Sequence, residues 1–179
     1  EKRGTKKTIH VAKKVSKPVR MERKPTAQDL HRNFGKYGKV DPLWKGETVY
    51  LIGGGPSLAK FEWNRLKNKK TIAINKAIQF YPNADALYWT DGRVYTWFRE
   101  DIDSFKGLKY TIRANGKEDI TSLKRGKKFG IEWAKDTIAH GNNSGCAAIN
   151  LAIHLGAKRI VLLGYDMGNN GKVSHFHDG

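Results

Sequence analysis

The residues of this 179-residue chain that could do chemistry gather near its C-terminal end and in one glycine-rich turn. His175 and His177 are one residue apart, so in an extended segment their side chains project to the same side. They could share a metal ion with a carboxylate such as Asp166 or Asp91, or a neutral imidazole could act as general acid or base. We take Asp166, His175 and His177 as candidate catalytic residues; a polar end segment without a chemical role is the alternative. The cofactor is left open, with a divalent metal such as Mg²⁺ or Mn²⁺ as the candidate.

The glycine-rich turn follows a short apolar run and consists of Gly53, Gly54, Gly55, Pro56 and Ser57. Glycines let the main chain turn sharply and bring its N–H groups close to an anion. Pro56 suits the first position of a helix, because its missing N–H would be unpaired there anyway. The positive end of that helix and the Ser57 hydroxyl could complete a phosphate site. A plain strand-to-helix turn is the alternative, since a Gly-x-Gly pattern alone has low specificity.

Two familiar nucleotide motifs do not match this turn. Leu58 stands where the dinucleotide fingerprint has its third glycine, and Asn75 ends the second apolar run, where an NAD enzyme has an acidic residue for the ribose. No Gly-Lys-Ser/Thr follows the glycines, so the turn is not a P-loop. Dinucleotide redox chemistry is therefore not expected.

The elements that must position these residues alternate between strands and helices. Continuous apolar runs, typical of strands covered on both faces, predict strands at 48–53, 70–75, 84–90, 108–114 and 159–164. Apolar periodicity and capping residues predict helices at 56–67, 94–105 and 144–155, and 129–134 is a candidate edge strand. The alternation predicts an α/β fold over 47–179, with a Rossmann-like, doubly wound, mostly parallel sheet.

Polar and small residues occupy one edge of this predicted sheet. In a doubly wound sheet the ligand lies beyond the carboxyl ends of the strands, where the strand order reverses. Asn143 or Ser144 is the predicted N-cap of the last helix, and Gly145 leaves room for a ligand. His140 is a further candidate nearby. The candidate binding residues are Gly53, Gly54, Gly55, Ser57, Asn75, Asp91, Asn143, Ser144 and Gly145.

Positive charge is concentrated at the N-terminal end. The formal net charge of the chain is +17, and residues 1–28 hold ten Lys or Arg against two Glu. We interpret 1–28 as a basic, extended arm and 29–46 as a short helix and linker. Such an arm favours phosphate-bearing partners, namely nucleic acid, or other virion proteins; a solvated tail is the alternative.

The number of cysteines and the hydropathy of the chain indicate which compartment the protein suits and whether a membrane partner is expected. Cys146 is the single cysteine, so no intrachain disulfide can form, which favours a reducing compartment or a virion assembled in one. We expect Cys146 to be a small core residue of the last helix. No apolar run is long enough to span a bilayer, so no membrane partner is expected.

Four segments together resemble known nucleotide-dependent proteins: GGGPSL, IN, YWTD and NSGCAAINLAIHLGAKRIVLLGYDM. The set is similar to the small bacterial sialyltransferases that use CMP-sialic acid, and to the 6-hydroxymethylpterin diphosphokinase-like group, which includes many phage proteins. The similarity spans about 49–177 and implies nucleotide contacts from Gly53, Gly55, Ser57, Asn75, Asp91, Asn143, Ser144 and Asp166. In those sialyltransferases an asparagine usually stands at the place of Gly54, and the catalytic histidine lies further along than Gly179. The resemblance therefore implies the nucleotide pocket more directly than it implies catalysis.

Two functions from different classes remain open at this point. One is a nucleotide-binding or nucleotide-sugar-binding, transferase-like domain, glycosyltransferase-like or diphosphokinase-like if active. The other is a non-catalytic phage structural or nucleic-acid-associated protein that keeps the same scaffold. Either protein would be cytoplasmic or virion-associated in a phage-infected bacterium.

Overall fold

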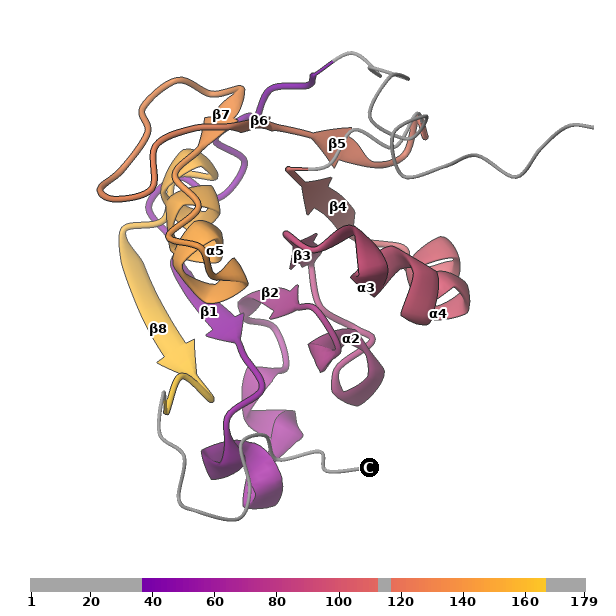
Figure 1. Ribbon diagram of the computed structural model, residues 1–179. Coiled ribbons are helices and arrows are strands. Elements are labelled where there is room, and N and C mark those ends of the chain that lie inside the picture. Colours follow the sequence, from indigo (N-terminus) through magenta and orange to yellow (C-terminus); the bar gives the residue numbers. More distant parts are fainter. Residues whose placement is uncertain (1–36, 113–116, 167–179) are drawn as a thin grey trace, which may run out of the picture.

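The computed structural model describes residues 37–112 and 117–166. The predicted arm at 1–28 and the candidate catalytic residues His175 and His177 lie outside the described residues. In the described part, six parallel strands form one sheet with helices on both faces (Figure 1). The fold is therefore α/β with a Rossmann-like parallel sheet, as the sequence predicts.

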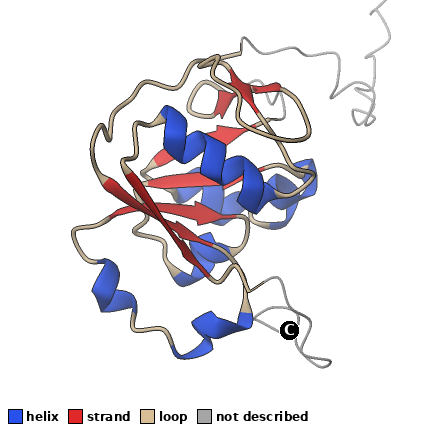
Figure 2. Ribbon diagram, turned by 90° about the vertical axis from the view of Figure 1, so that its left-hand side faces the viewer, coloured by secondary structure: helices blue, strands red, loops and turns tan. Residues whose placement is uncertain are grey.

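The strand order places a reversal beside the glycine-rich turn. The strands are β1 (Thr48–Ile52), β2 (Lys70–Ile74), β3 (Ala86–Trp89), β4 (Leu108–Thr111), β5 (Thr121–Ser122) and β8 (Arg159–Leu163). They lie in the order β5-β4-β3-β2-β1-β8 (Figure 1). Figure 2 shows the same sheet turned by 90°, with its strands in red. The chain thus builds outward from β1 to β5 and then returns to set β8 on the other side of β1. The order reverses between β1 and β8, which is where a doubly wound sheet binds its ligand.

Both faces of the sheet are buried at β1 to β4, which explains why these strands have continuous apolar sequences, whereas the edge strand β8 is partly exposed. Val49 and Leu51 of β1 pack on the face covered by α5 (Ser144–His154). Ile52 faces the opposite side, together with Leu87 of β3, in the cluster that includes the shorter helices. Figure 1 shows α5 on one side of the sheet and α2, α3 and α4 on the other. None of the helices in the described part of the chain is long and apolar enough to cross a membrane.

The predicted helix over 56–67 is wrong. The segment forms two short 3₁₀ helices, η1 (Pro56–Lys60) and η2 (Trp63–Leu66), joined by residues with extended dihedral angles. At the break, the Trp63 ring meets the Phe61 ring edge-on at 5.2 Å and stacks on the Tyr81 ring at 5.8 Å. The contact with Tyr81 is distant in sequence, and it forms where the chain leaves a helical path, so tertiary packing overrides local periodicity here.

Three further elements differ from the predictions. The helix predicted over 94–105 is divided into α3 (Gly92–Trp97) and α4 (Arg99–Ser104), and α2 (Ala77–Phe80) was not predicted. The candidate edge strand at 129–134 is not a strand. Instead, a small parallel pair, β6 (Lys124–Arg125) and β7 (Thr137–Ile138), flanks that segment. Cys146, in the first turn of α5, is exposed rather than buried in the core as predicted.

The described part of the predicted linker packs onto the domain. Val40 and Trp44 are buried in the core on the α5 face. The Val40 N–H donates to the Lys135 carbonyl at 2.9 Å, and the Trp44 N–H donates to the Leu155 carbonyl at 2.8 Å. Residues 37–46 therefore belong to the folded unit rather than forming a free connection.

Candidate functional site

A pocket of about 520 Å³ lies over the carboxyl ends of the central strands, at the reversal between β1 and β8. Its wall combines the glycine-rich turn, the residues that follow β2 and β3, the start of α5 and the end of β8. Eight of the nine predicted binding residues line it: Gly53, Gly54, Gly55, Asn75, Asp91, Asn143, Ser144 and Gly145. The ninth, Ser57, is exposed and is not part of this lining.

Most backbone N–H groups of the glycine-rich turn already have acceptors within the protein. Gly53 N–H donates to the Leu163 carbonyl and Gly55 N–H to the Gly164 carbonyl, both at 2.8 Å. Gly54 lies between them, and no acceptor for its N–H is found among the described residues. The turn therefore ties the end of β1 to the end of β8. A phosphate at this place would meet the Gly54 N–H rather than the amides on either side.

Asp166 occupies the place that the sequence assigns to an anion at the start of the first helix. Its Oδ2 accepts a hydrogen bond from the Ser57 N–H at 2.9 Å. This N–H first, and the Ser57 hydroxyl second, lower the pKa of the Asp166 carboxyl. The ionised carboxylate thus serves η1 as an internal cap. A Cβ at Gly55 would collide with this carboxylate and would lie 2.6 Å from the Gly164 carbonyl oxygen, so only glycine fits there.

Asn75 lines the pocket and carries an unsatisfied polar atom. It leaves β2 with a φ of 53°, in the left-handed region that asparagine tolerates better than most residues. Its N–H is held by the Tyr88 carbonyl at 3.0 Å. Its side-chain Oδ1 is buried, however, and has no hydrogen-bond partner among the described residues. A buried amide oxygen without a donor costs about 1–3 kcal/mol, so a ligand N–H or O–H at this point would remove a real penalty.

Asp91 and Asn143 both act as helix caps on the pocket wall. The Asp91 carboxylate accepts from the Arg93 N–H at 2.9 Å and pairs with the Arg93 guanidinium at 2.6 Å. The Asn143 Oδ1 accepts from the Gly145 N–H at 2.6 Å and from the Cys146 N–H at 3.3 Å, which confirms Asn143 as the N-cap of α5. The side-chain oxygens of Asp91 and Asn143 at these helix ends already accept hydrogen bonds from the protein. The Asn143 side-chain NH₂ is left as a donor toward a ligand.

Tyr165 packs beneath the start of α5 and explains the small residue there. Its hydroxyl donates to the Gly145 carbonyl at 3.2 Å, and burial raises its pKa. A Cβ at Gly145 would approach the Tyr165 ring to 2.8 Å. Glycine at this position therefore lets α5 and the end of β8 close on each other at the base of the pocket.

An apolar part of the pocket wall was missed by sequence reasoning. Val94, Trp97 and Phe98, from α3 and the residue after it, line the same pocket. Trp97 is 61% exposed, and the Arg93 guanidinium lies 5.2 Å from its ring centre. A large aromatic ring that is exposed beside a pocket often marks a binding surface. In the sequence, however, apolar periodicity alone predicts that a tryptophan is buried in the core.

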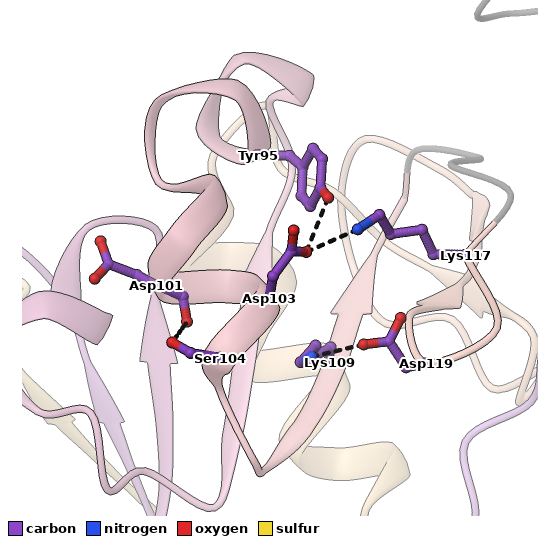
Figure 3. A network of polar contacts seen from close by, with 7 residues as sticks. All are labelled: Tyr95, Asp101, Asp103, Ser104, Lys109, Lys117 and Asp119. Carbon is purple, nitrogen blue, oxygen red and sulfur yellow. Dashed lines mark hydrogen bonds and ion pairs between the residues drawn. The ribbon is translucent and has the colours of Figure 1, made fainter.

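A polar network holds the helices that carry this wall (Figure 3). Asp103 of α4 accepts from the Tyr95 hydroxyl at 2.9 Å and from the Lys117 ammonium at 2.7 Å. Lys117 first, then Tyr95, lower the pKa of Asp103. Nearby, the buried Lys109 ammonium of β4 pairs with Asp119 at 2.6 Å. The network links α3 and α4 to the segment after β4, so the aromatic wall is fixed from behind.

The candidate catalytic set is only partly described. Asp166 lies beside the pocket, bonded to Ser57, whereas His175 and His177 are outside the described residues. Within 37–112 and 117–166, no group of three His, Cys, Asp or Glu side chains is arranged to hold a metal ion. Lys76 and Tyr165 join the pocket lining although the sequence did not single them out.

Comparison with protein families, with curated proteins and with solved structures finds no match for this chain.

Proposed function

We propose that the pocket between β1 and β8 binds a nucleotide, either a nucleoside phosphate or a nucleotide-sugar, and that the domain is transferase-like. The observation that carries the proposal is that one pocket at the strand-order reversal is lined both by aromatic side chains and by amide groups. The aromatic side chains are those of Trp97 and Phe98, and the amide groups are those of Gly54, Asn75 and Asn143. A base needs a flat apolar surface, and a ribose phosphate needs hydrogen-bond donors and acceptors.

Each part of a nucleotide has a counterpart in this pocket. A base stacked on Trp97 would lie in the same pocket as Asn75, whose buried Oδ1 would accept a hydrogen bond from a base amine or a ribose hydroxyl. A phosphate would meet the Gly54 N–H, and the Lys76 ammonium on the same lining supplies positive charge. The reasoning from the residues and the resemblance to nucleotide-dependent transferases support the same ligand class.

Transfer chemistry would draw on Asp166. Its lowered pKa keeps the carboxyl ionised at neutral pH, so it would act as a base, a cation ligand or an electrostatic stabiliser, and not as a general acid. His175 and His177 remain the proposed partners for proton transfer. A divalent metal such as Mg²⁺ or Mn²⁺ would have to use Asp166 together with ligand phosphates.

The basic arm is proposed to contact nucleic acid or other virion proteins, in the cytoplasm or the virion of a phage-infected bacterium. Ten Lys or Arg against two Glu in residues 1–28 support this part. This part of the proposal does not depend on the nucleotide pocket, and it would hold for a non-catalytic phage protein as well.

A thermal-shift panel of nucleoside mono-, di- and triphosphates and nucleotide-sugars, with and without Mg²⁺ or Mn²⁺, tests the proposal. A ligand at about 100 times its dissociation constant stabilises the folded state by roughly 2.7 kcal/mol. Stabilisation by one nucleotide class is the expected result, and no stabilisation by any member would contradict it. Consumption of the stabilising donor in a coupled assay would favour transfer, and its absence would favour a binding protein.

A further inference from the structure

A second cavity, of about 330 Å³, adjoins the candidate nucleotide pocket. The two share Asp91 and Ser144 in their linings, so a molecule in one is next to a molecule in the other. The wall that is specific to the second cavity includes Arg125, His140 and Asn142. Of these three, only His140 is a candidate from the sequence; Arg125 and Asn142 are found by the structure alone.

The small sheet of β6 and β7 positions Arg125 beside His140. Arg125 pairs with Ile138 across the two strands. Beyond the strands the ladder continues, since the Gly126 N–H donates to the Ile138 carbonyl at 2.8 Å and the His140 N–H to the Lys127 carbonyl at 3.2 Å. His140 is consequently fixed at the floor of the cavity with only 6% of its surface exposed.

The hydrogen bonds of His140 determine which ring nitrogen carries the proton. Its Nδ1 lies 3.0 Å from the Asn142 N–H, and a backbone N–H can only donate. The Arg125 guanidinium, also a pure donor, lies 3.5 Å from the same nitrogen. Nδ1 is therefore the acceptor, and the neutral ring carries its proton on Nε2. Burial, followed by the charges of Arg125 and Lys128, lowers the pKa of His140, which keeps the ring neutral.

The cavity consequently presents donors. Nε2–H of His140 has no acceptor among the described residues, and the Arg125 guanidinium adds N–H groups on the same wall. The carboxylate of Asp91, the acidic member of the lining, is neutralised by its ion pair with Arg93 at 2.6 Å. An acceptor-only group with negative charge is the complementary ligand.

We propose that this second cavity binds an anionic group, a phosphate or a carboxylate, through Arg125 and the Nε2–H of His140. Resting on the function proposed above, the anion belongs to the molecule that meets the nucleotide across Asp91 and Ser144. His140 then acts as a hydrogen-bond donor that positions this molecule and not as a general base, since its one acceptor nitrogen is held by Asn142.

Titration of the full chain with sodium phosphate, and separately with sodium acetate, at constant ionic strength tests the proposal without any nucleotide. The readout is the ¹⁵N shift of the His140 ring nitrogens. His140→Asn keeps an acceptor for the Asn142 N–H but removes the Nε2 donor, whereas His140→Gln keeps a donor near the Nε2 position. Arg125→Ala removes the guanidinium. Arg159→Ala is the matched control, because Arg159 is the first residue of the exposed edge strand β8 and lines neither cavity. For the variants that lack His140, binding is followed by the backbone amide shifts of Asn142 and Ser144.

We expect a saturable shift with at least one of the two anions, and the stronger of them identifies phosphate or carboxylate as the natural group. Binding should weaken roughly tenfold or more in Arg125→Ala and His140→Asn, and stay within about threefold of wild type in His140→Gln and Arg159→Ala. No saturable shift with either anion, or unchanged binding in His140→Asn, would overturn the proposal. A nucleotide titration of the same sample reports the proposed function separately, so either can fail while the other stands.

Discussion

The Asp166 carboxylate and the Ser57 N–H are 109 residues apart in sequence and form a hydrogen bond of 2.9 Å. The bond joins the segment after β8 to the first turn of η1, at the strand-order reversal where the candidate pocket lies. The sequence assigns Asp166 a catalytic role, and the structure gives it a capping role as well. Substitutions of Asp166 must therefore separate the contribution of its capping hydrogen bond from the contribution of its negative charge.

Asp166→Ala should destabilise the protein by about 0.5–1 kcal/mol, the lower part of the range for lost caps, because the carboxylate is exposed. Asp166→Asn keeps an oxygen that can accept from the Ser57 N–H, so this variant should lose clearly less stability than Asp166→Ala. Urea unfolding of both variants at pH 7 measures the difference. Equal loss in the two variants would mean that charge, not hydrogen bonding, stabilises this turn.

Trp97→Ala should weaken nucleotide binding by about 1–3 kcal/mol, the value of one stacked base, while leaving the free energy of unfolding nearly unchanged. Trp97 lines the pocket and is 61% exposed. Trp133 is 72% exposed and does not line the pocket, so Trp133→Ala is the matched control. Isothermal titration with the best nucleotide of the panel gives both affinities. An equal effect of the two substitutions would remove Trp97 from the site.

Stability should fall as the pH drops from about 7.5 to 5. Burial lowers the pKa of His154 and of His140 below the ordinary value of 6.5. The unfolded chain therefore takes up protons near pH 6.5 while the folded protein does not, so stability present above that pH is lost on acidification. The Thr137 carbonyl, which accepts from His154 Nε2 at 2.9 Å, opposes the shift, as does Glu132, while Lys135 adds to it.

Urea unfolding at several pH values checks this pH dependence, and His154→Gln should flatten part of the slope. A further loss is expected below about pH 4, as the carboxyls with lowered pKa, among them Asp119 and Asp136, are protonated. A stability that stays constant between pH 7.5 and 5 would show that the two buried histidines titrate normally.

The sequence predicts the sheet and the position of the pocket better than it predicts the helices. Strands buried on both faces have continuous apolar runs, and caps such as Asn143 have local hydrogen-bond chemistry, so both are readable from neighbouring residues. The break between η1 and η2 depends on Trp63 stacking on Tyr81, which is distant in sequence. The strands β6 and β7, two residues each, are too short to produce a pattern.

The candidate site also combines residues that the sequence predicts with residues that only the structure identifies. The residues at strand ends converge because parallel strands end at one edge, which topology alone dictates. The aromatic wall of α3 and the donors Arg125 and His140 reach the site through tertiary packing, which residue spacing does not encode. The amides of Gly53 and Gly55 were expected to face a phosphate, and their hydrogen bonds to the end of β8 became visible only in the structure.

The central claim, that the pocket binds a nucleotide through Asn75, is tested most directly by comparing Asn75→Gly with Asn68→Gly. Both asparagines have left-handed backbones, with φ of 53° and 61°, so glycine suits both positions. Only Asn75 lines the pocket and carries the unsatisfied oxygen. Isothermal titration with the nucleotide that stabilises wild type most should show affinity lowered about 5- to 30-fold in Asn75→Gly and unchanged in Asn68→Gly, with Asn75→Gly no less stable than Asn68→Gly. Wild-type affinity in a folded Asn75→Gly protein would contradict the account.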